Sequence, residues 1–180
     1  MRIAVIIVGV ILSISSWAQE GYKIDFKING LKDTTTYLGY YYGESTYIKD
    51  TARVNTNGEF QFASTTSLPQ GGYFLGLNKT RIFEIVVGSD QQFQMETSTA
   101  DYIKNMKVTG DDDNKIFFEN MMFNMARNQE ATPFFSLMND ESATEEAKTS
   151  ARASLQKINE KVFAYQNGIL EKYPQSMTAR

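Results

Sequence analysis

The chain of 180 residues is long enough for one ordinary domain with an appendage, because domains usually run about 100 to 150 residues. Hydrophobic residues make up 42% and charged residues 22%, near the averages of soluble globular proteins, which disfavours intrinsic disorder and a polytopic membrane protein. The net charge of −3 argues against nucleic acid as a partner, since that partner requires a basic stripe. The sequence has no Cys and no His, so it can form no disulfide and lacks the two residue types that most often do covalent or proton chemistry near neutral pH.

The first 18 residues have the layout of a secretory signal peptide. Arg2 precedes the apolar run IAVIIVGVIL, and Ser16 and Ala18 are small residues three and one positions before Gln19. The run is shorter than the about 20 residues of a membrane span. We therefore predict cleavage after Ala18 and export to the periplasm or cell envelope, with membrane contact only during export; a retained N-terminal anchor is the alternative. Cleavage removes Arg2 and no acidic residue, which makes the net charge one unit more negative.

Residues 19–109 are expected to form an antiparallel β domain. Apolar and polar side chains alternate with a period of two, which is typical of strands with one buried face. The predicted strands are Tyr22 to Asn29, Tyr37 to Tyr42, Thr46 to Val54, Glu59 to Ala63, Tyr73 to Leu77, Arg81 to Val87 and Gln92 to Thr97. Turn residues such as Asn57-Gly58 and Pro69 to Gly72 separate them. Short strands at this spacing predict a sandwich or small barrel.

Residues 110–180 change to the period of a helix. Asp111, Asp112 and Asp113 precede an apolar-periodic segment, where they are expected to cap free amide groups and to suit the helix dipole. Thr132-Pro133 and Asn139-Asp140 interrupt the pattern, and a second helix is predicted from about Ala143 to Lys172. Two such helices should form a hairpin, packed on the sheet or on each other. The fold class is therefore α+β overall.

The last residues suggest that the chain is a fragment. Tyr173-Pro174 ends the second helix, and Ser176 stands where the N-cap of a further helix is expected. The few residues after Ser176 cannot sustain a helix of their own. We therefore expect the chain to stop where a longer parent continues.

Two stretches carry a resemblance to a known family. The first is INGLKDTTTYLGYYYGESTYIKDTARVNTNGEFQFAS, with the pair Asp50-Thr51, the hairpin Asn57-Gly58 and the strand Phe60-x-Phe62. The second is VTGDDDNKIFFENMMF, with Gly110, Asn114 and Phe118. From about Tyr22 to its C-terminus the chain resembles the N-terminal domain of unknown function of exported thioredoxin-like proteins of the Bacteroidota, of thiol-disulfide oxidoreductase or AhpC-TSA type. Asp111 stands where that family usually has Ser.

The resemblance implies that the helical segment leads into a thioredoxin-like domain whose Cys-x-x-Cys pair performs thiol-disulfide exchange, a function in cell redox homeostasis. A thiolate is the attacking group in that exchange, and this chain has no Cys to supply one. The expected function is therefore that of a non-catalytic accessory region, which docks a client protein or a second copy of itself and positions the downstream redox domain. No catalytic residue, cofactor or metal site is predicted.

A tyrosine cluster is the candidate binding surface: Tyr37, Tyr40, Tyr41 and Tyr42, with Tyr47 nearby. Flat aromatic faces stack on sugars and peptides with little loss of side-chain freedom. In a strand Tyr40 and Tyr42 face opposite to Tyr41, so these three are not expected to line one site. The other interpretation is packing in the core or at its rim. The surface supports an alternative function, an independent periplasmic module that binds glycans or peptides.

Further candidates have structural alternatives. The run Asp111 to Asp113 lacks the ligand spacing of a calcium loop, so capping is the expected role. Thr51 and Thr34 resemble O-glycosylation sites of exported proteins in the same phylum, and the alternative is an unmodified hairpin threonine. The methionines Met121, Met122 and Met125 either bind a partner or belong to the core. An enzyme that acts through carboxylates has no paired motif to support it.

Overall fold

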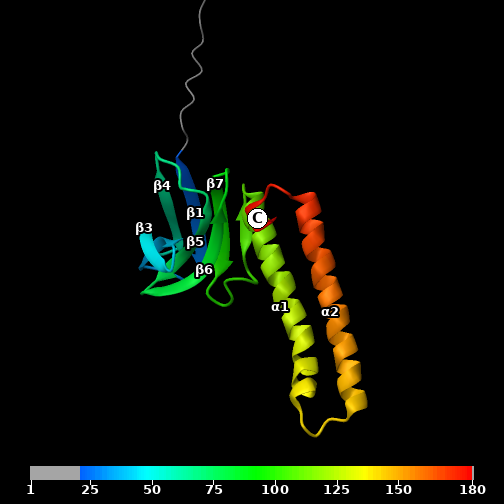
Figure 1. Cartoon of the computed structure of the whole chain (residues 1–180). Helices are drawn as coiled ribbons and strands as arrows, with labels where there is room; N and C mark the ends of the chain where they lie inside the picture. The colour runs from blue at the N-terminus through cyan, green and yellow to red at the C-terminus, as the bar shows by residue number, and fades with distance from the viewer. Residues whose placement is uncertain (1–20, 180) are drawn as a thin grey trace, which may run out of the picture.

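The computed structural model describes residues 21–179, so the predicted signal peptide and its cleavage point lie outside the described residues. The described chain forms a two-sheet β-sandwich followed by a helical hairpin, which confirms the expected α+β fold (Figure 1). The strands are β1 (Tyr22–Asn29), β2 (Thr35–Tyr42), β3 (Ser45–Arg53), β4 (Glu59–Ser64), β5 (Gly71–Leu77), β6 (Thr80–Val87), β7 (Gln92–Ser98) and β8 (Lys107–Thr109). The helices are α1 (Asp112–Asn139), α2 (Glu145–Lys172) and the short 3-10 helix η1 (Met177–Ala179).

Each sheet has four strands. The strand order is β4-β1-β7-β8 in the β1 sheet and β3-β2-β5-β6 in the β2 sheet. The expected antiparallel pairing holds for every neighbouring pair except β1 and β7, which are parallel with Ile24 opposite Phe93. A parallel pair needs a long crossover connection. Here the chain between β1 and β7 builds the whole β2 sheet and, between β3 and β5, strand β4 of the β1 sheet.

The core lies between the sheets and follows the predicted period of two. Along β1 the side chains of Tyr22, Ile24, Phe26 and Ile28 are buried, and the residues between them are not. The opposite wall includes Leu38, Leu75, Ile85 and Val87, which have no exposed surface. Burial of one such side chain stabilises the fold by about 1.5–3 kcal/mol. Because the sequence has no Cys, this packing rather than a disulfide holds the sandwich together.

A partly buried hydrogen bond joins the two sheets. The hydroxyl of Tyr22 on β1 donates to Oδ2 of Asp50 on β3 at 2.8 Å. Burial raises the pKa of the Tyr22 hydroxyl, and the bond to the Asp50 carboxylate raises it further. The other oxygen of Asp50, Oδ1, accepts from the backbone N–H of Thr51 at 2.7 Å. Asp50 in the Asp-Thr pair therefore has a structural role.

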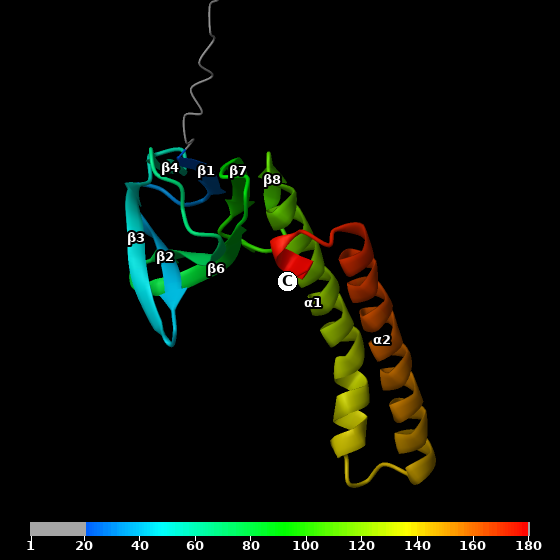
Figure 2. The same cartoon turned by 45° about the horizontal axis from the view of Figure 1, so that its top comes forward.

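The helical hairpin stands away from the sandwich. Figures 1 and 2 show the sandwich against the N-terminal turns of α1 only, while the remainder of α1 and α2 projects beyond it. Each helix has 28 residues, which corresponds to about 42 Å. The helices pack on each other through Ala131, Ala151 and Ile158, and the rings of Phe123 and Tyr165 stack at 3.9 Å. No helix within residues 21–179 is long and apolar enough to cross a membrane.

The predicted interruption at Thr132-Pro133 is wrong, because α1 continues through Pro133 to Asn139. Proline removes one backbone donor, and the carbonyl that loses its partner must find another. That carbonyl belongs to Gln129, which is exposed, as are Thr132 and Pro133, so this side of the helix faces water. The second interruption is confirmed, since α1 ends with Asp140 as its C-cap. Helix α2 begins at Glu145 with Thr144 as N-cap, two residues later than predicted.

Candidate binding surfaces

The tyrosines of β2 divide between the two faces of the sheet. Tyr40 points inward, where its ring lies 6.3 Å from that of Tyr73 and 5.7 Å from that of Tyr47. Tyr37 and Tyr41 point outward, and both rings contact Phe74 of β5. Tyr42, near the end of the strand, is 75% exposed. Packing at the rim of the core thus describes Tyr40, whereas Tyr37 and Tyr41 belong to a second aromatic cluster outside the sandwich.

Glycines make room for this outer cluster. Gly39 lies opposite Phe74 across the β2–β5 pair, and Gly76 lies opposite Tyr37. A Cβ atom on Gly39 would overlap the Phe74 ring, and one on Gly76 would overlap the Tyr37 ring. Each ring can therefore lie across the neighbouring strand. Phe74 is only 6% exposed although it is outside the main core.

Arg81 of β6 covers the outer cluster. Its guanidinium lies 5.6 Å from the centre of the Tyr41 ring and 5.9 Å from that of Phe74, within cation–π range. It donates to the Tyr41 hydroxyl, which in turn donates to Oε1 of Glu84 at 2.6 Å. Burial, then the bond to Glu84, raise the pKa of the Tyr41 hydroxyl. Tyr41 is thus held in a polar network and is not a free stacking surface.

A hollow of about 550 Å³ on the outer face of the β1 sheet is polar. Its carboxylates already have partners: Asp25 accepts from Gln61 and lies 3.6 Å from Lys23, which is outside the hollow. Asn29 donates to Glu96 at 3.1 Å. The face resembles an ordinary solvated sheet surface on which the carboxylates of Asp25 and Glu96 already have partners.

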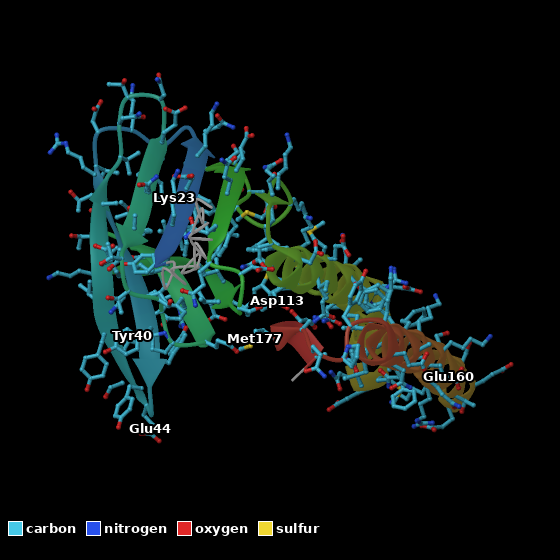
Figure 3. All side chains as sticks on the ribbon, turned by 90° about the horizontal axis from the view of Figure 1, so that it is seen from above. Lys23, Tyr40, Glu44, Asp113, Glu160 and Met177 are labelled. Carbon is cyan, nitrogen blue, oxygen red and sulfur yellow. The ribbon has the colours of Figure 1, made fainter. Side chains whose placement is uncertain are left out.

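A second hollow, of about 450 Å³, lies where β2 separates from β5, and we call it the tyrosine fork. It is lined by Tyr40, Tyr41, Tyr42, Lys49, Pro69, Gln70, Gly71, Gly72 and Tyr73. The expectation that Tyr40, Tyr41 and Tyr42 do not line one site is therefore wrong. The side chains do alternate, but the hollow lies at the end of the β2–β5 ladder and receives contributions from both faces. Figure 3 places Tyr40 and the adjacent hairpin residue Glu44 on the side of the sandwich away from the helical hairpin.

Lys49 enters the fork because of a β-bulge. Leu38 pairs with Asp50 and Gly39 pairs with Ile48, so Lys49 is the extra residue of β3. A bulge turns a side chain out of the regular alternation. Among the residues that line the fork, Lys49 is the one with a charged side chain. The sequence pattern did not reveal Lys49, because a bulge depends on the register of two strands.

The candidate glycosylation sites differ in accessibility. Thr51 on β3 is exposed, whereas Thr34 is half-buried and its carbonyl accepts from the backbone N–H of Val54 at 2.8 Å. Exposure is a requirement for O-glycosylation, and Thr51 meets it better than Thr34. Modification of Thr51 and Thr34 stays a prediction.

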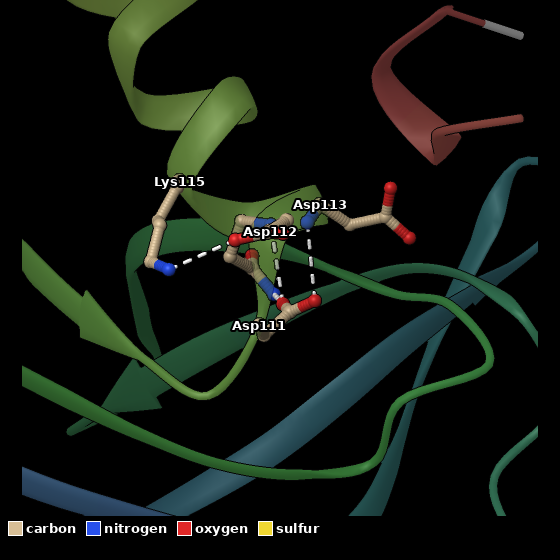
Figure 4. Close-up of polar contacts among 5 residues, drawn as sticks. Asp111, Asp112, Asp113 and Lys115 are labelled. Carbon is tan, nitrogen blue, oxygen red and sulfur yellow. Dashed lines mark hydrogen bonds and ion pairs between the residues drawn. The ribbon is translucent and has the colours of Figure 1, made fainter. Parts of the chain in front are cut away.

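The aspartate run at the start of α1 is structural. Asp111 is the N-cap and accepts from the backbone N–H groups of Asp113 and Asn114, both at 3.1 Å (Figure 4). Asp112 pairs with Lys115 at 2.8 Å. Burial raises the pKa of Asp111, and the hydrogen bonds from Asn114 oppose that shift. The predicted capping is confirmed, and within residues 21–179 no cluster of acidic side chains has a geometry suited to a metal ion.

The third aspartate anchors the C-terminal segment. Oδ1 of Asp113 accepts from the backbone N–H of Met177 at 2.9 Å, which fixes η1 beside the start of α1. Ser176 caps η1 as expected, since its hydroxyl accepts from the N–H of Ala179 at 3.2 Å. Figure 3 shows Asp113 and Met177 next to each other between the sandwich and the hairpin. The last turn is a single turn of 3-10 helix, in line with the expectation that no α-helix forms there.

The helical hairpin exposes large apolar side chains. They are Met122, Met125, Phe135, Phe163 and Leu170. Phe118 is buried in the sandwich core, and Met121, Met122 and Met125 follow it at three, four and seven residues, which is one face of a helix. The face of α1 that packs on the sandwich thus continues past the sandwich as methionines. The interpretation of Met122 and Met125 as core residues is wrong, because 36% and 42% of their surfaces are exposed.

These observations define a class: an α+β protein in which an eight-stranded sandwich, counted over residues 21–179, carries a projecting helical hairpin. A family model described as a domain of unknown function (DUF4369) matches residues 22–117, more than half of the chain, and the chain belongs to that family. The match covers the sandwich and the first turns of α1. Comparison with curated proteins gave no match, and comparison with solved structures gave none either.

Proposed function

We propose that this chain is the non-catalytic accessory region of an exported thiol-disulfide oxidoreductase-like protein. In this proposal it docks a client protein or a second copy of itself and thereby positions the redox domain of a full-length parent. Two features of the sequence support it: the resemblance of residues 22–180 to the accessory domain of such proteins, and the lack of any cysteine. Without a thiolate the chain itself has no attacking group for disulfide exchange.

The observation that carries the proposal is the uncovered apolar surface of the helical hairpin. Large exposed apolar patches on soluble proteins mark interaction sites. Phe163, on α2, is 67% exposed, and Met125, on α1, follows the buried Phe118 on the same helix face. Methionine side chains adapt to differently shaped partners at little cost. The hairpin therefore provides a surface suited to docking.

A photo-crosslinking amino acid at position 125 or 163 tests this proposal in exporting cells. We expect crosslinks whose partner peptide, identified by mass spectrometry, comes from a Cys-x-x-Cys domain, from a client of that domain or from another copy of this chain. Asn128 and Gln156 are exposed polar positions on the same helices and serve as matched controls. Equal labelling at the control positions, or crosslinks to lipid alone, would contradict the proposal.

A second candidate function is an independent binding module for peptides or glycans. The tyrosine fork favours it, since a concave site lined by aromatic side chains with a few polar groups is typical of ligand-binding sites. Its volume of about 450 Å³ is in the range of such sites. The fork lies on the side of the sandwich away from the hairpin, so the two functions do not compete for one surface.

A further inference from the structure

We propose that the tyrosine fork binds an extended peptide segment that carries an acidic residue among apolar ones. This inference rests on the second candidate function and names its ligand class. Four properties of the fork support it: unpaired strand edges, open space above two glycines, tyrosine walls and one cation without a partner.

The fork is bordered by strand edges that lack a neighbour. The β2–β5 ladder ends where Tyr40 lies opposite Tyr73. Beyond that point β2 continues to Tyr42 in pairing with β3 alone, and Gly71 and Gly72 of β5 pair with β6 alone. The edge of β2 at Tyr41-Tyr42 and the edge of β5 at Gly71-Gly72 therefore face each other across the fork without pairing. Backbone N–H and C=O groups need hydrogen-bond partners.

An extended peptide supplies the partners that such edges need. Its backbone alternates donors and acceptors along a strand, which is the basis of recognition by strand addition. A glycan binds mainly through hydroxyl groups and ring stacking, and it lacks the regular alternation of donors and acceptors that a strand edge requires. The unpaired edges at Tyr41-Tyr42 and Gly71-Gly72 therefore favour a peptide over a glycan.

The two glycines leave room for a ligand backbone. A Cβ atom on Gly71 would meet nothing within 4 Å, and one on Gly72 would meet only the Tyr41 ring at 4.0 Å. This contrasts with Gly39 and Gly76, where aromatic rings already occupy the space above the glycine. The space above Gly71 and Gly72 is thus open to a second chain. Close approach of another backbone is a common reason for glycine in a strand.

The side chains of the fork indicate which residues the peptide carries. The exposed Tyr42 and the half-buried Tyr40 present ring surface to apolar side chains, and rings hold such contacts at low entropic cost. Lys49 is exposed, and within residues 21–179 it has neither an ion pair nor a side-chain hydrogen bond. A carboxylate on the ligand complements it, because no acidic side chain lines the fork.

The test uses a fluorescent probe peptide of alternating valine and glutamate and measures its binding to the purified protein by fluorescence anisotropy. Two matched probes replace glutamate by glutamine or methylate alternate backbone nitrogens. We expect the glutamine probe to bind about tenfold more weakly, as a lost charge-assisted hydrogen bond implies. The methylated probe should show no binding, because it lacks the donors for strand addition.

Two variants locate the site. Lys49→Gln should weaken binding of the glutamate probe about tenfold and leave binding of the glutamine probe unchanged. Gly72→Val should abolish binding of both probes, because its side chain fills the open space; valine is favoured in strands, so the variant should fold. Lys27→Gln, on the outer face of the β1 sheet, is the control and should have no effect.

The outcomes separate this inference from the function on which it rests. Binding of neutral oligosaccharides such as xylohexaose, without binding of the peptide, would overturn the peptide inference and preserve the binding module. If the protein bound neither the peptide nor the oligosaccharide, both the peptide inference and the binding module would be overturned. Peptide binding that survives Gly72→Val in a folded variant would exclude the fork as the site.

Discussion

Asn114 and Val86 exchange two hydrogen bonds, which fasten α1 to the free edge of the β2 sheet. The backbone N–H of Val86 donates to Oδ1 of Asn114 at 2.9 Å, and Nδ2 of Asn114 donates to the carbonyl of Val86 at 2.6 Å. The amide side chain thereby takes the place of a neighbouring strand next to β6, and it has no exposed surface. The junction between sandwich and hairpin thus combines this polar contact with the burial of Phe118 of α1 in the sandwich core.

Replacement of Asn114 should therefore loosen the hairpin. Asn114→Ala leaves the partly buried N–H and C=O of Val86 without these partners, and loss of a partner inside the protein costs about 1–3 kcal/mol. We expect the free energy of unfolding to fall by about 2–4 kcal/mol in urea titrations. The control Asn124→Ala, on the same helix but with one side-chain bond to Asn120, should cost less than about 1 kcal/mol. Equal costs for the two variants would contradict this role of Asn114.

The bond between Tyr22 and Asp50 should appear in the dependence of stability on pH. The pKa of Tyr22 is raised in the folded protein, so the folded state holds this proton more tightly than the unfolded state does. Its contribution is fully present below the unfolded pKa of about 10 and is lost as the pH rises above it. Between pH 10 and 11, the free energy of unfolding should fall more steeply for the native protein than for Tyr22→Phe.

The difference between these two slopes should approach about 1.4 kcal/mol per pH unit, the value for one proton. Tyr42→Phe is the matched control, because Tyr42 is exposed. The slope for this variant should equal that for the native protein. Parallel curves for the native protein and Tyr22→Phe would show that the buried hydroxyl ionises as easily as in the unfolded chain.

Two glycine substitutions should change the stability of the protein in opposite directions. Gly58 has φ +81°, and a Cβ atom there would overlap the carbonyl oxygen of Ile28, so Gly58→Ala should destabilise the protein by more than about 1–2 kcal/mol. Gly168 lies inside α2 with nothing within 4 Å of an added Cβ atom. Gly168→Ala should stabilise the protein by about 0.5–1 kcal/mol. Thermal unfolding followed by circular dichroism measures both changes, and a shared sign would contradict this account of the two positions.

Release of the C-terminal turn should follow removal of the Asp113 carboxylate. Asp113→Ala takes away the acceptor of the Met177 N–H, so this amide should exchange its hydrogen faster by about tenfold or more. Asp112→Ala removes a more exposed carboxylate from the same run, and the exchange at Met177 should then stay unchanged. Hydrogen exchange read by NMR provides the measurement. Unaltered protection in Asp113→Ala would mean that other contacts hold η1.

Local patterns in the sequence predict most elements of the fold, because strand and helix periods depend on neighbouring residues. The local period predicts seven strands and the second long helix near their observed bounds, but it wrongly predicts a break of the first helix at Thr132-Pro133. Strand β8 has three residues, too few for a period to appear. The parallel direction of β7 beside β1 depends on contacts far apart in the chain, which a local period does not encode.

The candidate site was only partly predictable for the same reason. The tyrosines of β2 were identified by their residue type, and their alternation between faces was expected. The hollow that joins Tyr40, Tyr41 and Tyr42 arises because β2 and β5 separate, and Lys49 enters it through a bulge. Both features belong to pairings between strands. The sequence alone does show the lack of cysteine on which the accessory role depends.

The most direct test of the accessory role is the mass and peptide map of the native protein, isolated from its own cells with an antibody against the sandwich. The account predicts a polypeptide that begins at Gln19 and continues past Arg180 into a thioredoxin-like domain with a Cys-x-x-Cys pair. A native polypeptide that ends at Arg180 would contradict the accessory role.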